Sequence, residues 1–376
     1  MAGVEILPVS SKADQKRFLT LPWKLNAHDP NWVPPLRDQQ KRLCGFAHHP
    51  FYDAAESQAF LAVRGGEAVG RILAVDNQAH NDWNKEKRGF YGFFESVDDQ
   101  AVSGALFDAA ADWHRDRGMT ALRGPTDPCI NYEMGLLVDG FDTPPFFMLT
   151  HNPQYYGPLH DAYGFEKAQD LYGYWGEKGM LGRLKRDEKM KNIDEQVQER
   201  FGVSVRGMKR GKFRQEVEMF LDIYNQALSA TWGYVPMSRS EVLHMAAELK
   251  YMIVPELARI AEVDGKPVGV MFGLLDYNTR IKQIDGRLFP FGFARLLMNK
   301  RGIKRIRLVS TNVLPEYQNW GVGVCLARSM TKPALDHGVT ACEFSWVLET
   351  NDLSRKTIEK GGARRYKTWR IYDKEL

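Results

Sequence analysis

The residues best suited to bind a ligand lie in one loop, where a strand is expected to lead into a helix. Residues 306–313 alternate and are rich in β-branched side chains, which predicts a strand, and residues 324–334 have apolar positions at helical spacing. Gln318, Gly321 and Gly323 lie between them. A turn of this kind leaves backbone N–H groups unpaired at a helix start, where the helix dipole favours negative charge. The loop is therefore a candidate pyrophosphate site.

A second group of polar residues lies in a long loop of the first half. Residues 124–156 mix polar side chains with glycine, proline and aromatic residues. Long loops of this composition are where binding residues tend to collect. We expect Asn131, Glu133 and His151 to shape an acceptor site at the interface of two domains, with Glu133 a candidate catalytic residue. The alternative for His151 is a purely structural role.

The elements that must position these residues occur twice along the chain. Residues 60–75 and residues 258–275 each predict a β-hairpin. Gly70 and Gly269 occupy the same place in the two hairpins, an offset of 269 − 70 = 199. A glycine stop followed by an aromatic strand recurs near the end of each half at almost the same offset. The matched order indicates a duplication, with a helix-plus-turn insertion in the second half and a compensating insertion in the first.

The repeat predicts an α/β protein with two tandem domains, each a mixed central sheet flanked by helices. We expect the first domain to cover residues 1–178, a charged linking helix to cover 179–202, and the second domain to cover 203–376.

Composition limits the classes of function. The formal charge of +4 over 376 residues is too small for a protein that coats nucleic acid. No run of about 18 apolar residues appears, so no membrane-spanning segment is expected. The four cysteines show no C-x-x-C spacing, which argues against a disulfide framework or a metal site and favours a cytoplasmic location.

The glycine loop resembles the pyrophosphate loop of the GNAT acyltransferases. Gln318, Gly321 and Gly323 match the family pattern Gln/Arg-x-x-Gly-x-Gly/Ala after an apolar strand, and residues 351–362 resemble the family's Asn-x-x-Ala-x-x-Leu-Tyr-x-x-x-Gly helix. The resemblance covers residues 203–376. Dinucleotide and P-loop nucleotide sites fit less well, because neither G-x-G-x-x-G nor G-K-S/T occurs here.

The resemblance implies an acetyl-CoA or longer acyl-CoA co-substrate, no metal, and a small-molecule amine as acceptor. In GNAT proteins two central strands diverge beside the loop and the pantetheine arm lies in the gap. The implied acyl-CoA contacts are Asn312, Val313, Leu314, Gln318, Asn319, Trp320, Gly321, Val322, Gly323, Val324 and Asn351.

Catalysis of amine acylation needs a proton acceptor for the attacking ammonium. The diverging strands would bring several polar side chains near the thioester, among them Ser345, and Glu349 at the end of its strand is the first candidate base; a solvated carboxylate with no role is the alternative. The family often places a tyrosine on the last helix as general acid, but Ile358 occupies that position. The acid must therefore come from another residue or from water.

The first half is expected to have lost acyl-CoA binding. Its corresponding loop, residues 96–105, keeps little of the pattern, and Asp98 and Asp99 would repel a pyrophosphate.

Three functions remain open: an acyl-CoA-dependent N-acyltransferase, a non-catalytic acyl-CoA sensor, and an aminoacyl-tRNA-dependent transferase of the tandem-GNAT type. The segment 285–300 mixes aromatic residues with Arg and Lys. It is either an amphipathic surface for a lipid or a cover over an ordinary core. The oligomeric state cannot be derived.

Overall fold

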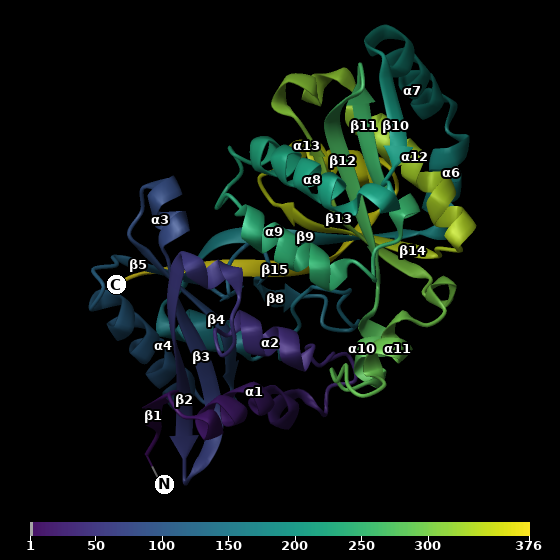
Figure 1. The fold of residues 1–376 in the computed structure, drawn as a ribbon. Coiled ribbons are helices and arrows are strands. Elements are labelled where there is room, and N and C mark those ends of the chain that lie inside the picture. Colours follow the sequence, from purple (N-terminus) through teal and green to yellow (C-terminus); the bar gives the residue numbers. More distant parts are fainter. Residues whose placement is uncertain (1–2) are drawn as a thin grey trace. The chain divides into compact units, whose positions relative to one another are not determined.

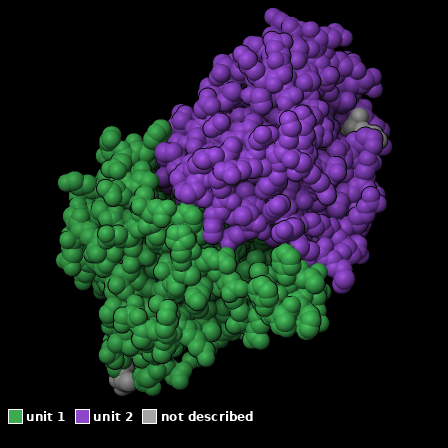
Figure 2. All heavy atoms as spheres, viewed as in Figure 1, with its two compact units in different colours: residues 1–171, 278–296, 367–376 green, residues 172–277, 297–366 purple. Residues whose placement is uncertain are grey.

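The chain forms two compact α/β units. The structure is a computed structural model that describes residues 3–376. Unit 1 runs to Leu171 and includes Asn278–Leu296 and Lys367–Leu376, whereas unit 2 consists of Tyr172–Tyr277 and Leu297–Tyr366 (Figure 2). The chain changes unit within two of its strands, β9 (Glu166–Glu177) and β15 (Arg364–Glu375). The two units are described separately below.

Unit 1 contains most of the first half of the chain (Figure 1). Its helices are α1 (Lys12–Asn26), α2 (Arg37–Leu43), α3 (Gln78–Asn84), α4 (Gln100–Arg115), α5 (Tyr156–Tyr163), α10 (Asn278–Gln283) and, but for its last residue, α11 (Gly292–Leu297). Its strands, besides parts of β9 and β15, are β1 (Glu5–Pro8), β2 (Ala55–Arg64), β3 (Glu67–Asn77), β4 (Arg88–Ser96), β5 (Ala121–Gly124), β6 (Thr126–Asp127), β7 (Glu133–Met134) and β8 (Leu136–Asp139).

The sheet of unit 1 is antiparallel from β1 through β2 and β3 to β4, and β5 then pairs parallel with β4. The C-terminal part of β15 pairs antiparallel with β5 and β8. Helix α4 packs on β2 and β3 and buries Leu106, Phe107 and Ala110 completely. Positions spaced by three and four residues lie on one face of a helix, so these side chains form the inner stripe that closes the core.

Unit 2 repeats this plan. Its helices are α6 (Lys178–Arg186), α7 (Glu188–Phe201), α8 (Phe213–Ala227), α9 (Arg239–Leu249), α12 (Val322–His337) and α13 (Asp352–Lys360). Its strands, besides parts of β9 and β15, are β10 (Val203–Gly207), β11 (Ala258–Val263), β12 (Lys266–Leu275), β13 (Arg305–Val313) and β14 (Ala341–Leu348). The sheet is antiparallel from β10 to β13, and β14 then pairs parallel with β13.

The duplication predicted from the sequence is confirmed by this order of strands. Four antiparallel strands, one helix and a parallel fifth strand occur in both units, and the helix, α4 or α12, has 16 residues in each. The expected insertions are also present. The second half inserts α10 and α11 between β12 and β13, and the first half inserts β6 to β8 after β5.

The units are discontinuous in sequence because residues 278–296 and 367–376 pack with the first half. Asp285, for example, accepts a hydrogen bond from Trp23 Nε1 and forms an ion pair with Arg37. The boundaries expected at residues 178 and 203 stay a prediction about separate domains. None of the helices within residues 3–376 combines the length and the hydrophobicity needed to cross a bilayer.

Candidate functional site

Strand β13 separates from its parallel neighbour halfway along its length. It pairs with β14 from Arg305 to Leu308, and within the described chain no strand pairs with β13 on that side beyond Leu308. On its other side β13 stays paired with β12 as far as Val313, with a β-bulge at the step between Leu308 and Ser310. A bulge bends a strand and increases its twist, which accounts for the divergence from β14.

The divergence leaves part of the β13 backbone without a strand partner. Leu314 N–H donates to Val268 O at 2.9 Å, on the β12 side. Hydrogen-bonding groups alternate in direction along a strand, so Asn312 also faces β12, whereas Thr311 and Val313 face the side that β14 has left. Among the three predicted backbone contacts, Val313 is thus the residue that presents its groups to this open edge. Its carbonyl accepts a hydrogen bond from Gln318 Nε2 at 3.1 Å.

The turn after β13 brings the chain to an open helix start. A short 3₁₀ turn, Pro315–Trp320, ends at Gly321, which has a φ of +88° and also begins α12. No side chain of the described residues caps α12, and the amides of Gly321, Val322 and Gly323 have no acceptor there. A Cβ added to Gly323 would meet nothing within 4 Å. These amides at the positive end of the α12 dipole form a cradle of the kind that binds phosphate oxygens.

Helix α7 holds this turn in place. Trp320 stacks on Phe201 at the end of α7, with ring centroids 4.4 Å apart. A Cβ on Gly321 would lie 2.9 Å from Val197 Cγ2, so only glycine allows this close approach. Arg328 of α12 also pairs with Asp194 of α7 at 3.1 Å. The charged segment 179–202 therefore has a solvated outer face and an inner face that packs on α12.

The equivalent region of unit 1 is closed. Strand β4 has the same bulge, at Phe93 with a φ of +49°, and its pairing with β5 ends at Phe90. Here, however, the Asp127 carboxylate accepts the Phe93 N–H, and Asp99 caps α4 by accepting the Ala101 N–H at 2.8 Å. The backbone groups that stay open in unit 2 are thus satisfied by aspartates in unit 1. The loss of acyl-CoA binding by the first half stays a prediction.

The polar side chains expected around the thioester lie in different environments. Glu343 is fully buried, and Ser345 accepts a hydrogen bond from Arg307 Nε at 3.0 Å across the point where β13 and β14 part. Glu349 follows β14 and is half-buried. Asn351 caps α13 by accepting the Ser354 N–H at 3.1 Å, so its side-chain oxygen is occupied.

The packing around Ile358 accounts for an apolar residue at the position where the family often has tyrosine. It packs against an apolar cluster of unit 2 that includes Tyr174, Met180 and Val347. Tyr174 instead directs its hydroxyl to Glu359 Oε1 at 2.9 Å. An apolar residue at position 358 thus serves the packing of α13.

Unit 1 contains a cavity of about 160 Å³, and two of the residues predicted for the acceptor site, Glu133 and His151, line it. Asn131 is not part of its wall. His151 Nε2 lies 2.7 Å from Asp29 Oδ2. Sequence analysis missed Asp29, because it lies 122 residues away in a turn after α1 and no local pattern links the two residues.

Comparison with known proteins places the chain in a family. No protein-family model matches the sequence. The chain is 38% identical to the bacterial ceramide synthase of Caulobacter vibrioides over 383 residues, which cover 100% of this chain and 98% of that protein. It is also 33% identical to protein YghO of Escherichia coli, with coverage of 97% and 94%.

Two solved structures share the fold. A tandem GNAT protein of the clavulanic acid biosynthesis pathway aligns with a TM-score of 0.57 at 13% identity, over 99% of this chain and 98% of that one. The chain has the fold of a tandem GNAT protein, and it belongs to one family with the bacterial ceramide synthase of Caulobacter vibrioides and protein YghO. A GCN5-related glucosamine N-acetyltransferase region of a fungal multi-domain β-N-acetylglucosaminidase aligns with a TM-score of 0.59 at 14% identity. The chain spans 38% of the length of that larger protein.

The loop residues predicted from the sequence have different structural roles. The amides of Gly321 to Gly323 form the open helix start, while Gln318 and Trp320 use their side chains to brace the turn. Asn319 is exposed. Across residues 3–376 no three His, Cys, Asp or Glu side chains cluster as a metal site would require.

Proposed function

We propose that this chain is an acyl-CoA-dependent N-acyltransferase whose thioester binds in unit 2. The observation that carries the proposal is the pairing of two features at one place: an uncapped start of α12 and an unpaired edge of β13 next to it. The pyrophosphate of coenzyme A binds the amides of Gly321 to Gly323, with Gln318 to Val324 forming the turn around it. The pantetheine arm pairs with Val313, as an added strand would.

The reaction follows from the chemistry of thioesters and amines. The acceptor loses a proton, its nitrogen attacks the thioester carbon, and the C–N bond forms as the C–S bond breaks. The nitrogen gives up a second proton, and the leaving thiolate takes one to become coenzyme A. Because a thiol has a pKa near 8.5, its thiolate is only weakly basic and leaves readily, and water can protonate it. Ile358 is compatible with this route, and Glu349 remains a candidate base.

The acceptor we propose is a long-chain amino alcohol. The relative at 38% identity is named a bacterial ceramide synthase, and a ceramide is the amide of a fatty acid with such an amine. A long-chain acyl-CoA would then be the donor. Acyl transfer of this kind forms one amide bond and needs no metal.

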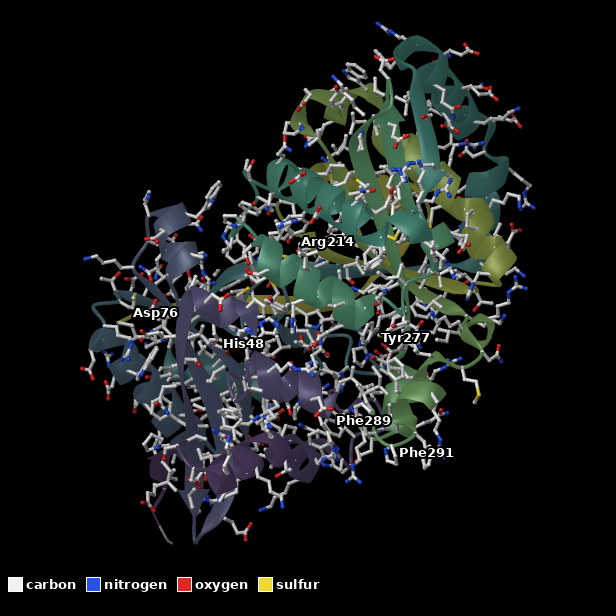
Figure 3. The ribbon with its side chains drawn as sticks, in the orientation of Figure 1. His48, Asp76, Arg214, Tyr277, Phe289 and Phe291 are labelled. Atoms are coloured by element: carbon white, nitrogen blue, oxygen red, sulfur yellow. The ribbon has the colours of Figure 1, made fainter. Side chains whose placement is uncertain are left out.

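A surface segment of unit 1 supports contact with lipid. Phe289, Phe291 and Phe293 are exposed, the first two by 78% and 71%, and the exposed Arg287 and Arg295 flank them in the sequence. Figure 3 labels Phe289 and Phe291 beside α11. Exposed aromatic side chains with basic neighbours suit the surface of an anionic membrane, where a long-chain amine would be dissolved.

The test is to titrate the protein with coenzyme A thioesters of graded acyl-chain length and to measure its unfolding temperature at each concentration. Binding stabilises the folded state by RT ln(1 + [L]/Kd), about 2.7 kcal/mol at a hundredfold excess over Kd. We expect stabilisation by long-chain thioesters and release of free thiol when a long-chain 2-amino-1,3-diol is added. Absence of stabilisation by any thioester would contradict the proposal. Stabilisation without thiol release for any amine would instead indicate a sensor.

A further inference from the structure

Unit 2 carries a group of basic side chains from three elements that are distant in the sequence. They come from the 3₁₀ turn Arg210–Lys212 and the residue before it, from the residue that follows α9, and from a second 3₁₀ turn, Lys300–Gly302. Five of these side chains are exposed and that of Lys300 is half-buried. We call the group the basic surface of unit 2, and its six cations are Lys209, Arg210, Lys212, Lys250, Lys300 and Arg301.

The contacts around Tyr251 bring the three elements together. Helix α8, which follows the first 3₁₀ turn, packs beside α9 (Figure 1). Lys250 Nζ lies 5.9 Å from the centre of the Phe213 ring, at the start of α8, and 5.8 Å from the centre of the Tyr251 ring. Lys300 Nζ donates a hydrogen bond to Tyr251 O. The end of α9 therefore joins the cations of the two turns into one surface.

The neighbouring carboxylates leave most of this positive charge uncompensated. Glu218 pairs with Arg214 and Arg239, and Glu248 lies 3.5 Å from His244. Glu256 is exposed and contributes one negative charge. Within the described chain, no carboxylate forms an ion pair with the five exposed cations of the surface, Lys209, Arg210, Lys212, Lys250 and Arg301. The basic surface therefore has a clear excess of positive charge.

The pKa of a neighbouring histidine responds to this charge. Burial lowers the pKa of His337, whereas the Lys300 carbonyl, which lies 3.2 Å from His337 Nε2, opposes the shift. Lys304 and Arg301 lower the pKa further. Nearby cations disfavour the protonated form of a histidine because like charges repel. The potential around the second 3₁₀ turn is therefore positive.

Two apolar side chains are exposed among the cations. Tyr251 is 55% exposed, and Met298, two residues before Lys300, is 68% exposed. Tyrosine is enriched where a protein meets the headgroup layer of a membrane, because its ring is apolar and its hydroxyl is polar. The phosphates of a nucleic acid would also attract the cations, but they give an exposed methionine no apolar partner. The composition of the surface therefore favours lipid over nucleic acid.

We propose that the basic surface of unit 2 binds the headgroups of anionic phospholipids at a membrane surface. The proposal goes beyond the proposed function, since it requires neither a thioester nor an amine. It is also separate from the aromatic segment of unit 1, which would act by burying rings and not by charge. The cations contact lipid phosphates while Tyr251 and Met298 enter the headgroup layer. Each Lys or Arg close to an anionic membrane raises the affinity roughly fivefold.

A triple variant that combines Arg210→Gln, Lys250→Gln and Arg301→Gln tests the proposal. Binding of the full-length protein is measured by co-sedimentation with vesicles of phosphatidylcholine and phosphatidylglycerol in equal parts, with no thioester present. We expect the triple variant to lose affinity at least tenfold. Higher ionic strength should weaken binding of the wild type more steeply than that of the variant, because salt screens the charges that the variant lacks.

The matched control removes three cations from other helices of unit 2. It combines Lys191→Gln, Lys332→Gln and Lys356→Gln, so the net charge of the protein falls equally. Each of these lysines already pairs with a carboxylate of its own helix. We expect the control to bind the vesicles within about twofold of the wild type, since an exposed ion pair contributes little.

Three outcomes would overturn the proposal. They are equal affinities of the two triple variants, equal binding of the wild type to vesicles with and without phosphatidylglycerol, and tighter binding to a double-stranded oligonucleotide than to the vesicles. If the first triple variant does not fold, Lys250→Gln alone is measured, and it should lose affinity roughly fivefold. None of these results bears on the binding of thioesters, so failure of this proposal and failure of the proposed function are distinguishable.

Discussion

The two glycines at the start of α12 differ in whether the fold tolerates a side chain. A substitution can therefore be chosen that affects ligand binding without affecting folding. Gly321 has a φ of +88° and lies against Val197, so any side chain there strains the backbone and displaces α7. Gly323 has no such constraint, since a Cβ would meet open space. A substitution at Gly323 therefore fills the space in front of the open amides without disturbing the fold.

We predict that Gly323→Glu lowers the affinity for acyl-CoA at least tenfold and leaves the unfolding temperature of the free protein within a few degrees of the wild type. The added carboxylate occupies the phosphate cradle and repels the pyrophosphate. Calorimetric titration with a long-chain acyl-CoA measures the affinity. Gly104→Glu on α4 is the matched control, because a Cβ there also meets nothing within 4 Å and the aspartates of unit 1 already close that helix start. Equal affinities in the two variants would rule out the α12 site.

We predict that stability falls between pH 6.5 and pH 4 because of two buried histidines. Burial lowers the pKa of His114 and of His160 to about 4. The unfolded chain, in which a histidine has a pKa near 6.5, binds these protons at higher pH than the folded chain does, so the stability is complete above pH 7 and is lost as the pH falls through this range. The loss by pH 4.5 is about 2 to 3 kcal/mol per histidine.

Urea unfolding at pH 7 and pH 4.5 measures this loss. His114→Gln retains a donor for Phe90 O, to which His114 Nε2 lies at 2.9 Å, but it cannot titrate. Its stability should drop by about 2 to 3 kcal/mol less than that of the wild type between the two pH values. The same loss of stability in both proteins would show that the His114 imidazole does not contribute to the pH dependence.

Elements with a local signal could be predicted from the sequence. The two hairpins, the strand before the loop and the helix after it follow from alternation, turn residues and helical spacing, and the structure has all of them. The β13 bulge and the role of α7 could not be predicted in this way. Val197 and Phe201 support the turn through contacts across more than 100 residues, and their spacing on a charged helix looks like that of any solvated helix.

The exposed aromatic segment between α10 and α11 leads to a prediction about membrane binding. Phe289→Ser combined with Phe291→Ser should reduce binding of the protein to vesicles that contain anionic lipid at least tenfold, because each phenylalanine buried in the interface contributes about 1.5–3 kcal/mol. Co-sedimentation with such vesicles measures the bound fraction. Trp83→Ser is the control, since Trp83 is an exposed aromatic residue of α3 outside this segment. If both variants bind vesicles as the wild type does, the segment is only a cover over the core.

In the whole molecule, segments from the second half of the sequence pack in unit 1. Unit 1 is completed by the last ten residues, where Trp369, Ile371 and Tyr372 are almost fully buried and β15 pairs with β5 and β8. The repeat pattern predicts two successive domains because it records only which segments resemble each other. It carries no information about which copy of the sheet a strand joins, since an aromatic strand fits either one.

This topology predicts that the N-terminal segment 1–178, which the repeat marks as a domain, does not fold when produced alone. Without β15 it lacks three buried aromatic and aliphatic side chains, each worth about 1.5–3 kcal/mol, and it leaves the edge of β5 unpaired. That loss is comparable to the whole stability of an ordinary domain, about 5–15 kcal/mol. Circular dichroism and urea unfolding of the fragment should show no cooperative transition, and a fragment in which residues 362–376 are fused after a flexible linker should recover part of it. A fragment 1–178 that unfolds cooperatively without the added strand would mean that the first half is a self-sufficient domain and that β15 only lies against it.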